Sequence, residues 1–224
     1  MTSLAIFDFD GTLGDTTGII LTTMAATFKA MGQQPLSEAQ YRSVIGLPLE
    51  KCFSALIPLD EEGEAKYAAA YRKKFDELDR KGMVTLYPGV LETLVKLKER
   101  GVRLAIASSR HRHTLDRYVS ELGLAPLIEI TIGADDVTKA KPDPEPVNII
   151  LRKLGVPAEE TIMVGDAPYD ILMGRAAGCR TVAVTYGNGT AEDLKAAGAD
   201  SLADSFYLLT LLVYNKCIDN HYSR

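Results

Sequence analysis

The sequence predicts an α/β fold, a doubly wound parallel sheet whose first strand is followed by a small all-helical insertion. From residue 84 onward, short apolar runs alternate with amphipathic stretches, which is typical of parallel strands joined by helical crossovers. Near the N-terminus, the apolar run from Leu4 to Phe7 predicts one further buried strand. Residues 14–83 contain helical patterns with no convincing strand between them, and they therefore predict the insertion.

Length and net charge limit the possible domain organisation of the chain and the kinds of partner that it can bind. A chain of 224 residues can hold one large domain, or a domain with an insertion. The net charge of −5 argues against a nucleic-acid surface, which would carry a basic stripe. No apolar run approaches a membrane span, and the N-terminus leads into a polar motif rather than a signal sequence. We therefore expect a cytoplasmic protein that binds neither nucleic acid nor membranes. Its oligomeric state stays open, with a monomer favoured.

The cysteines point to no chemistry of their own. Cys52, Cys179 and Cys217 are odd in number, widely spaced and without nearby histidines. This pattern argues against both a disulfide framework and a zinc cluster. We interpret them as small buried hydrophobic residues.

Two apolar stripes at helical spacing predict the main helices of the insertion. They are Ile20, Met24, Phe28 and Met31, and then Tyr67, Tyr71, Phe75 and Leu78 on a longer, highly charged helix. For the second stripe we favour packing within the insertion over contact with a substrate. We predict a core domain of residues 1–13 and 84–224 and a cap domain of residues 14–83, with hinges near Gly14 and Gly82. Because the insertion follows the first strand, we expect it to lie over the carboxyl ends of the sheet as a lid.

Glycines end the predicted helices of the core domain. The apolar faces are Leu91, Leu94 and Leu97 before Gly101; Leu115, Tyr118, Val119 and Leu122 before Gly123; and Val147, Ile150, Leu151 and Leu154 before Gly155. Asp143 is the expected N-cap of the third helix, with Pro144 in its first turn. Strands are predicted over residues 103–107, 161–164 and 181–184, and a further helix through Ile171 and Leu172 ends at Gly178.

The most informative motif is Asp8-Phe9-Asp10-Gly11-Thr12, directly after the first strand. Two carboxylates in this setting are costly unless a cation or a reacting centre lies between them. The alternation of a strand points Asp8 and Asp10 in the same direction, and Gly11 allows a turn whose N–H groups could face an anion. The motif therefore predicts a site for a metal and a phosphate.

Other polar residues follow the predicted strands at the same edge of the sheet. They are Ser108 and Ser109, Lys141, and Asp166 and Asp170. Taken singly, the serine at 108 and the aspartate at 166 could simply cap helices, and the lysine could be a surface residue. Parallel strands bring all of them together beside the first motif, and this coincidence favours a functional site.

This set of residues resembles the four motifs of the haloacid dehalogenase-like hydrolase superfamily, in order and over nearly the whole chain. The resemblance is to the phosphoglycolate phosphatase-like subgroup, which has a Rossmann-like core and a helical cap between the first two motifs. It implies a Mg²⁺-dependent phosphatase that acts on a small phosphorylated metabolite, such as a phosphoglycolate-like compound, a sugar phosphate or pyrophosphate.

Chemistry and this resemblance together imply a role for each of these residues. Asp8 would form an aspartyl-phosphate, and Asp10 would serve as general acid and then base. Lys141 and Ser108 complete the catalytic set, by offsetting charge and donating to a phosphoryl oxygen. The expected substrate-binding residues are Gly11, Thr12, Ser109 and Arg110. The expected metal ligands are Asp8, Asp166, the backbone carbonyl of Asp10, and Asp170 either directly or through metal-bound water.

Two alternatives remain open. A β-phosphoglucomutase-like mutase also needs both aspartates, but the segment Ile45 to Glu50 lacks the Lys and Arg that such mutases present around the glycine. A non-catalytic phosphate-binding module would bind Mg²⁺ without turnover. The resemblance argues against a haloacid dehalogenase, which would carry no carboxylate at the position of Asp10. For the basic cluster Arg110 to His113, we favour a solvated helix start over contact with a second anionic group of the substrate.

Overall fold

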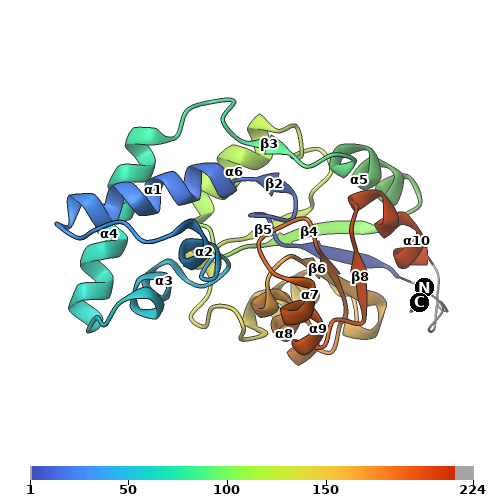
Figure 1. Cartoon of the computed structure of the whole chain (residues 1–224). Helices are drawn as coiled ribbons and strands as arrows, with labels where there is room; N and C mark the ends of the chain where they lie inside the picture. Colours follow the sequence, from blue (N-terminus) through green and yellow to red (C-terminus); the bar gives the residue numbers. More distant parts are fainter. Residues whose placement is uncertain (1, 215–224) are drawn as a thin grey trace.

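A computed structural model describes residues 2–214, and its centre is a six-stranded sheet (Figure 1). The strands are β1 (Leu4–Phe7), β4 (Arg103–Ala107), β5 (Ile130–Ile132), β6 (Thr161–Gly165), β7 (Arg180–Val184) and β8 (Ser201–Ala203). Their order is β5-β4-β1-β6-β7-β8, and every pairing is parallel. The first strand lies at the centre, with Phe7 level with Ile106 and with Val164. The polar motif that follows it therefore lies in the middle of the sheet's carboxyl edge.

Helices cover both faces of this sheet, as the doubly wound prediction requires. They are α5 (Val90–Glu99), α6 (Arg112–Glu121), α7 (Glu145–Leu154), α8 (Pro168–Ala176), α9 (Ala191–Ala196) and α10 (Leu209–Tyr214), with short 3-10 turns at Ala134–Asp136, Ala158–Glu160 and Phe206–Leu208. Alternate residues of β1 point to opposite faces. Phe7 packs in the cluster that includes α5, α6 and α10, whereas Ile6 packs in the cluster of α7 and α8. Both sides of the strand are thus buried, which accounts for its continuous apolar sequence.

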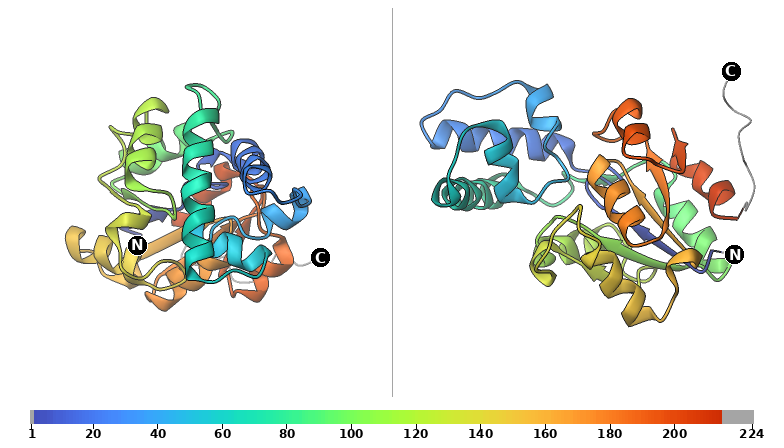
Figure 2. Two further views of the ribbon diagram at one scale, coloured as in Figure 1. Left: turned by 90° about the vertical axis from the view of Figure 1, so that its left-hand side faces the viewer. Right: turned by 90° about the horizontal axis from the view of Figure 1, so that it is seen from below.

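The segment between β1 and α5 is mostly helical. Its helices are α1 (Thr17–Ala30), α2 (Glu38–Arg42), α3 (Leu49–Leu56) and α4 (Glu61–Leu78). They lie together beyond the carboxyl ends of the strands (Figures 1 and 2). An aromatic cluster holds them: the ring centroids of Phe53 and Tyr67 are 5.2 Å apart, and those of Phe28 and Tyr67 are 5.7 Å apart. Offset or edge-on aromatic pairs of this kind stabilise a small core beyond their buried area.

A short ribbon, absent from the sequence prediction, joins the two groups of elements. Strand β2 (Gly14–Asp15) pairs antiparallel with β3 (Thr85–Leu86). Each strand has only two residues, so neither produces a readable periodicity. Gly14 is needed here because a Cβ atom would lie 2.9 Å from the Phe9 ring. The ribbon brings the ends of the helical segment together beside the strand that carries Asp8.

Several local expectations need correction. Leu91 is 42% exposed, and the inner face of α5 is formed by Val90, Thr93, Leu94 and Leu97 instead. Helix α7 begins at Glu145 with Pro144 as its N-cap, one residue later than expected. The carboxylate of Asp143 nevertheless accepts a hydrogen bond from the Glu145 N–H, 2.9 Å away. The side chain of Asp143 therefore still caps the start of the helix, although Asp143 lies one residue before the N-cap position.

The cysteine prediction agrees with the structure where the structure describes it. Cys52 and Cys179 are buried thiols, while Cys217 lies outside the described residues. Burial raises the pKa of both thiols to about 12, so neither is a ready thiolate at neutral pH. Within residues 2–214, no helix combines the length and apolar character that a bilayer crossing requires.

Candidate active site

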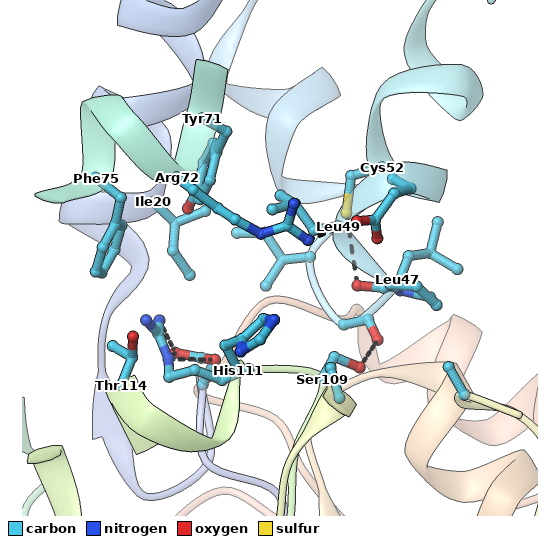
Figure 3. A pocket seen from close by; sticks show the side chains of 18 of the residues that line it. Ile20, Leu47, Leu49, Cys52, Tyr71, Arg72, Phe75, Ser109, His111 and Thr114 are labelled. Atoms are coloured by element: carbon cyan, nitrogen blue, oxygen red, sulfur yellow. Dashed lines mark hydrogen bonds and ion pairs between the residues drawn. The ribbon is translucent and has the colours of Figure 1, made fainter. Parts of the chain in front are cut away.

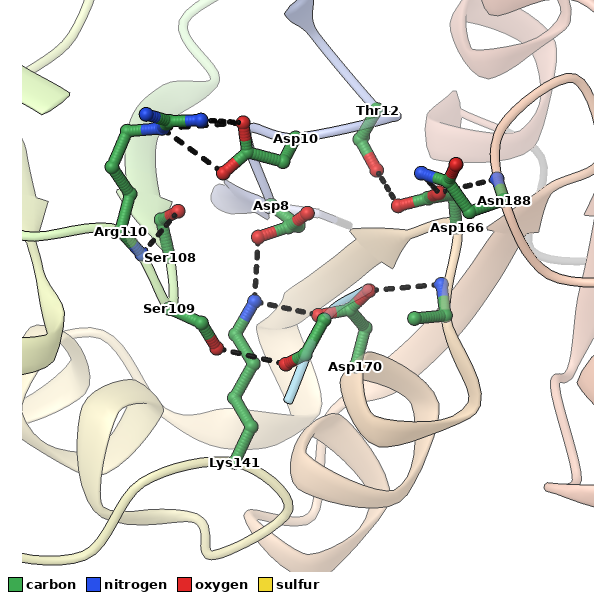
Figure 4. A network of polar contacts seen from close by, with 12 residues as sticks. Asp8, Asp10, Thr12, Ser108, Ser109, Arg110, Lys141, Asp166, Asp170 and Asn188 are labelled. Carbon is green, nitrogen blue, oxygen red and sulfur yellow. Dashed lines mark hydrogen bonds and ion pairs between the residues drawn. The ribbon is translucent and has the colours of Figure 1, made fainter. Parts of the chain in front are cut away.

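The carboxyl edge of the sheet brings the predicted polar residues close together (Figure 4). Asp8 directly follows β1, Ser108 follows β4 and Asp166 follows β6, three strands that are neighbours in the sheet. Lys141 enters from the loop before α7, and Asp170 lies in the first turn of α8. Because parallel strands end at a common edge, residues separated by more than a hundred positions meet here.

Lys141 lies between two of the carboxylates. Its Nζ donates to Oδ1 of Asp8 and to Oδ1 of Asp170, each at 2.6 Å. Its side chain is almost completely buried. Burial favours the neutral amine, but the charges of Asp170 and Asp8 outweigh it and raise the pKa of Lys141. The lysine is therefore a fixed ammonium group beside Asp8.

Three carboxylates form a compact acidic cluster around this ammonium. One oxygen from each of Asp8, Asp166 and Asp170 lies within 4.8 Å of the others, and all three residues are buried. Burial raises the pKa of Asp8 well above its usual range; Lys141 opposes this, whereas Asp170 and Asp166 add to it. Burial, followed by the charge of Asp170, raises the pKa of Asp166 to about 7. One ammonium does not neutralise three buried carboxylates, and this donor set fits a hard divalent cation.

Hydrogen bonds hold Asp166 in place from both sides. Its Oδ1 accepts from the Thr12 hydroxyl at 3.1 Å, and its Oδ2 accepts from Asn188, from the backbone N–H at 2.7 Å and from Nδ2 at 3.0 Å. Asn188 is not among the residues that the sequence predicted for the site. It lies in the loop after β7, and a search for polar residues after that strand could have found it.

The turn after Asp10 differs from the expected anion cradle. The N–H of Gly11 donates to the Gly14 carbonyl at 3.0 Å, and the N–H of Thr12 donates to the Phe9 carbonyl at 3.3 Å. These amides are therefore engaged in the turn itself. Gly11 is required for space instead, since it has a φ of +86° and an added Cβ would lie 2.1 Å from Oδ2 of Asp166.

Asp10 forms an ion pair with Arg110. Nε of the arginine donates to both carboxylate oxygens at 3.1 to 3.2 Å, and Nη2 donates to Oδ1 at 2.6 Å. The guanidinium carbon lies 5.0 Å from the ring centroids of both Phe75 and Tyr118, so the cation is held between two aromatic faces. The arginine side chain is only 9% exposed. The expectation of a solvated helix start is thus wrong for Arg110, because this pair and the two rings bury it.

The other residues of the basic cluster lie at a solvated helix start, as expected. Helix α6 begins at Arg112, and the side chain of His111 is 52% exposed, with Nδ1 3.1 Å from Asp135. His113 is exposed as well.

The two serines have different environments. The hydroxyl of Ser108 accepts from the N–H of Arg110 at 3.2 Å, which leaves its own proton free to donate. The hydroxyl of Ser109 donates to the carbonyl of Gly46 at 2.8 Å, in the loop before α3. Ser109 therefore connects the sheet edge to the helical segment in this structure.

A cavity of about 450 Å³ lies between the sheet edge and helices α1, α3 and α4 (Figure 3). Asp8, Asp10 and Ser109 line its floor, and Ile20, Leu49 and Tyr71 line the opposite wall. The aromatic stripe on α4 serves two purposes. Tyr71 stacks on Phe75 with ring centroids 6.0 Å apart, which agrees with the predicted packing within the insertion. Both rings also face the cavity.

Comparisons with known proteins agree with this geometry. The haloacid dehalogenase-like hydrolase family model matches residues 5–184. The chain is 36% identical over 211 residues to a probable phosphatase, IndB, of Dickeya dadantii, covering 92% of this chain and 91% of that protein. It is 36% identical over 181 residues to the pyrophosphatase PpaX of Halalkalibacterium halodurans, covering 81% and 82%. It is 31% identical over 217 residues to the phosphoglycolate phosphatase of Vibrio cholerae, covering 94% and 96%.

Solved structures of this family also resemble the chain in fold. A haloacid dehalogenase-like family hydrolase from Streptococcus pneumoniae superposes with a TM-score of 0.82 at 25% identity, covering 95% of this chain and 98% of that chain. The chain therefore belongs to the haloacid dehalogenase-like hydrolases, in their phosphoglycolate phosphatase-like subgroup, and is an enzyme of the phosphatase type.

Proposed function

We propose that the protein is a Mg²⁺-dependent phosphatase that hydrolyses a small phosphorylated metabolite through an aspartyl-phosphate on Asp8. One observation carries this proposal. The carboxylate of Asp8 lies 2.6 Å from a buried ammonium and within 4.8 Å of two further buried carboxylates, at the floor of a cavity that also contains Asp10. A carboxylate held beside an ammonium and a cation site is equipped to attack a phosphoryl group.

Asp8, Asp166 and Asp170 would hold the Mg²⁺ ion, together with the backbone carbonyl of Asp10. Their oxygens match the preference of Mg²⁺ for a few carboxylates completed by substrate and water oxygens. When bound, the ion neutralises negative charge on the phosphoryl group and on the attacking carboxylate.

The chain's own residues lower the electrostatic barrier to attack. Two unit charges 4 Å apart repel by about 4 kcal/mol at an effective dielectric constant near 20. The Lys141 ammonium offsets part of this repulsion because it contacts the attacking carboxylate directly. The free hydroxyl proton of Ser108 would donate to a phosphoryl oxygen, where charge concentrates in the transition state.

Asp10 would donate a proton to the leaving oxygen and then accept one from the water that cleaves the aspartyl-phosphate. In this structure both of its oxygens accept hydrogen bonds from Arg110. We infer that Arg110 sets the position of Asp10 and that the pair loosens during the proton transfers. Because Phe75 of α4 contacts the guanidinium, a movement of residues 14–83 as a cap about Gly14 and Gly82 would act on this pair.

Phosphate release from a panel of phosphorylated metabolites tests the proposed function. We expect Mg²⁺-dependent release from at least one member, loss of release in excess EDTA, and recovery when Mg²⁺ is restored. The Asp166→Asn variant should require a much higher Mg²⁺ concentration, because it removes one of the three cluster carboxylates. Isomerisation of a sugar phosphate that outpaces phosphate release would instead favour a mutase.

The Arg110→Met variant tests the positioning of Asp10. A positioned general acid contributes about 10²- to 10⁴-fold to rate, so we expect kcat for alkyl phosphates to fall by about 10²-fold. With 4-nitrophenyl phosphate, whose leaving group needs no proton, we expect kcat to change far less. Arg110→Lys keeps the charge but lacks the bidentate contact, so its kcat for alkyl phosphates should lie between those of the wild type and Arg110→Met. Equal losses on both substrates would contradict the positioning role.

A further inference from the structure

The wall of the cavity that faces Asp8 and Asp10 is strongly apolar. Its side chains come from α1, from the loop before α3, from α3 and from α4. They include Ile20, Met24, Ile45, Leu47, Leu49 and Phe75. Figure 3 shows Ile20, Leu47, Leu49 and Phe75 on the side of the cavity opposite His111 and Ser109. A leaving group attached to a phosphate on Asp8 would be directed toward this wall.

The arginines that line the cavity are already paired with carboxylates that also line it. Nη2 of Arg72 lies 2.5 Å from Oε1 of Glu50, and Nη2 of Arg110 lies 2.6 Å from Oδ1 of Asp10. Asp76 adds a further, exposed carboxylate to the lining. Among the described lining residues there is no lysine, and the imidazoles of His111 and His113 are exposed to solvent.

We propose that the substrate is a phosphate monoester whose leaving group is uncharged and largely apolar. This inference rests on the proposed function and specifies its substrate class. To pair with an arginine of the cavity, a second anionic group, such as a carboxylate or another phosphate, would have to displace Glu50 from Arg72 or Asp10 from Arg110. An apolar group needs no such exchange, and it gains from leaving water for the aliphatic wall. The hydroxyl of Tyr71, which points into the cavity in Figure 3, can serve an uncharged polar atom of the leaving group.

A homologous series of alkyl phosphates measures the apolar contribution. From methyl to butyl phosphate, the leaving groups are of similar chemical reactivity, and only the apolar surface grows. Full burial of each methylene corresponds to an increase in kcat/KM of about fourfold, so we expect a rise of about twofold to fourfold per carbon.

Anionic analogues with the same number of carbon atoms measure how far a second anionic group lowers kcat/KM. We expect kcat/KM for 4-phosphooxybutanoate to lie at least about tenfold below that for butyl phosphate, and 2-phosphoglycolate and pyrophosphate to be poor substrates as well. The Glu50→Gln variant frees the guanidinium of Arg72. In that variant, the ratio of kcat/KM for 4-phosphooxybutanoate to that for butyl phosphate should rise by about tenfold.

Glu62→Gln is the matched control, because Glu62 is an exposed residue of α4 whose partner is Lys66 and which does not line the cavity. Its ratio should equal that of the wild type. A wild-type preference for 2-phosphoglycolate, pyrophosphate or the carboxylate analogue would overturn the inference while leaving the phosphatase function intact. Absence of hydrolysis of every compound with Mg²⁺ would overturn the proposed function itself, and the inference with it.

Discussion

The Asp8→Asn variant is expected to lose at least about 10⁴-fold in kcat for phosphate release, since an amide cannot form the acyl-phosphate that the proposed reaction requires. The side chain is buried, and its Oδ1 already accepts a hydrogen bond from Lys141. The carboxamide keeps the size of the carboxylate and retains one oxygen for that bond. The expected loss is therefore chemical, and the fold should survive.

Single-turnover phosphate release in Mg²⁺, with circular dichroism to verify the fold, measures this effect. Mass spectrometry of acid-quenched wild-type enzyme should detect one added phosphoryl group on the peptide that contains Asp8, and none on that peptide in the variant. Asp204→Asn makes the same exchange at an exposed carboxylate and should leave turnover unchanged. Retention of a tenth or more of wild-type turnover by Asp8→Asn would refute the nucleophile assignment.

Local patterns were sufficient to predict the centre of the fold and several of the polar residues that meet at its edge. The run Leu4 to Phe7 predicted a buried strand because both of its faces are covered, which removes any polar alternation. Once strands and crossovers alternate, a general rule of parallel sheets places the following residues at one edge. Asp8, Lys141 and Asp166 could therefore be grouped without knowledge of a single distance.

Features that depend on long-range contacts could not be predicted in the same way. Arginine is usually a surface residue, and Arg110 is buried only because Phe75, Tyr118 and Asp10 pack around it. Asn188 is a candidate because it lies in the loop after β7, but only its contact with Asp166, across 22 positions, assigns it to the site. The short strands β5 and β8 have three residues each, too few to show alternation.

The hydrogen-bonded turn after Asp10 illustrates a different limit. A glycine after a carboxylate motif is compatible with free amides that face an anion, and equally with a closed turn. The sequence does not distinguish these, because the choice depends on whether the Gly14 carbonyl reaches the Gly11 N–H. In the proposed mechanism, Ser108, Lys141 and the metal ion would therefore hold the phosphoryl oxygens in place of these amides.

The Lys141→Met variant is expected to lose both activity and stability. Methionine keeps much of the side-chain volume but leaves Asp8 and Asp170 without the ammonium that contacts each of them at 2.6 Å. Removal of one partner from a buried ion pair costs about 3–5 kcal/mol, because the remaining charge stays buried. For a domain of this size each kcal/mol shifts Tm by about 2–4 °C, so we expect Tm to fall by about 6–20 °C.

The pH dependence gives this prediction a second readout. The pKa of Asp166 is raised to about 7 in the fold, so between its ordinary value and pH 7 the folded state binds more protons than the unfolded state. The free energy of unfolding of the metal-free protein should therefore fall as pH rises from about 4 to about 7. Without the Lys141 ammonium, repulsion within the acidic cluster grows, and this fall should be steeper in Lys141→Met.

Thermal melts of metal-free protein at several pH values, with and without Mg²⁺, measure both effects. Mg²⁺ should raise the Tm of the variant, since a divalent cation in the cluster replaces part of the missing positive charge. Lys139→Met makes the same exchange at an exposed position two residues earlier and should change stability by no more than about 0.5 kcal/mol. If Lys141→Met matched this control in Tm at neutral pH, the ammonium would not be needed to neutralise the buried carboxylates, and the electrostatic basis of the proposed mechanism would be wrong.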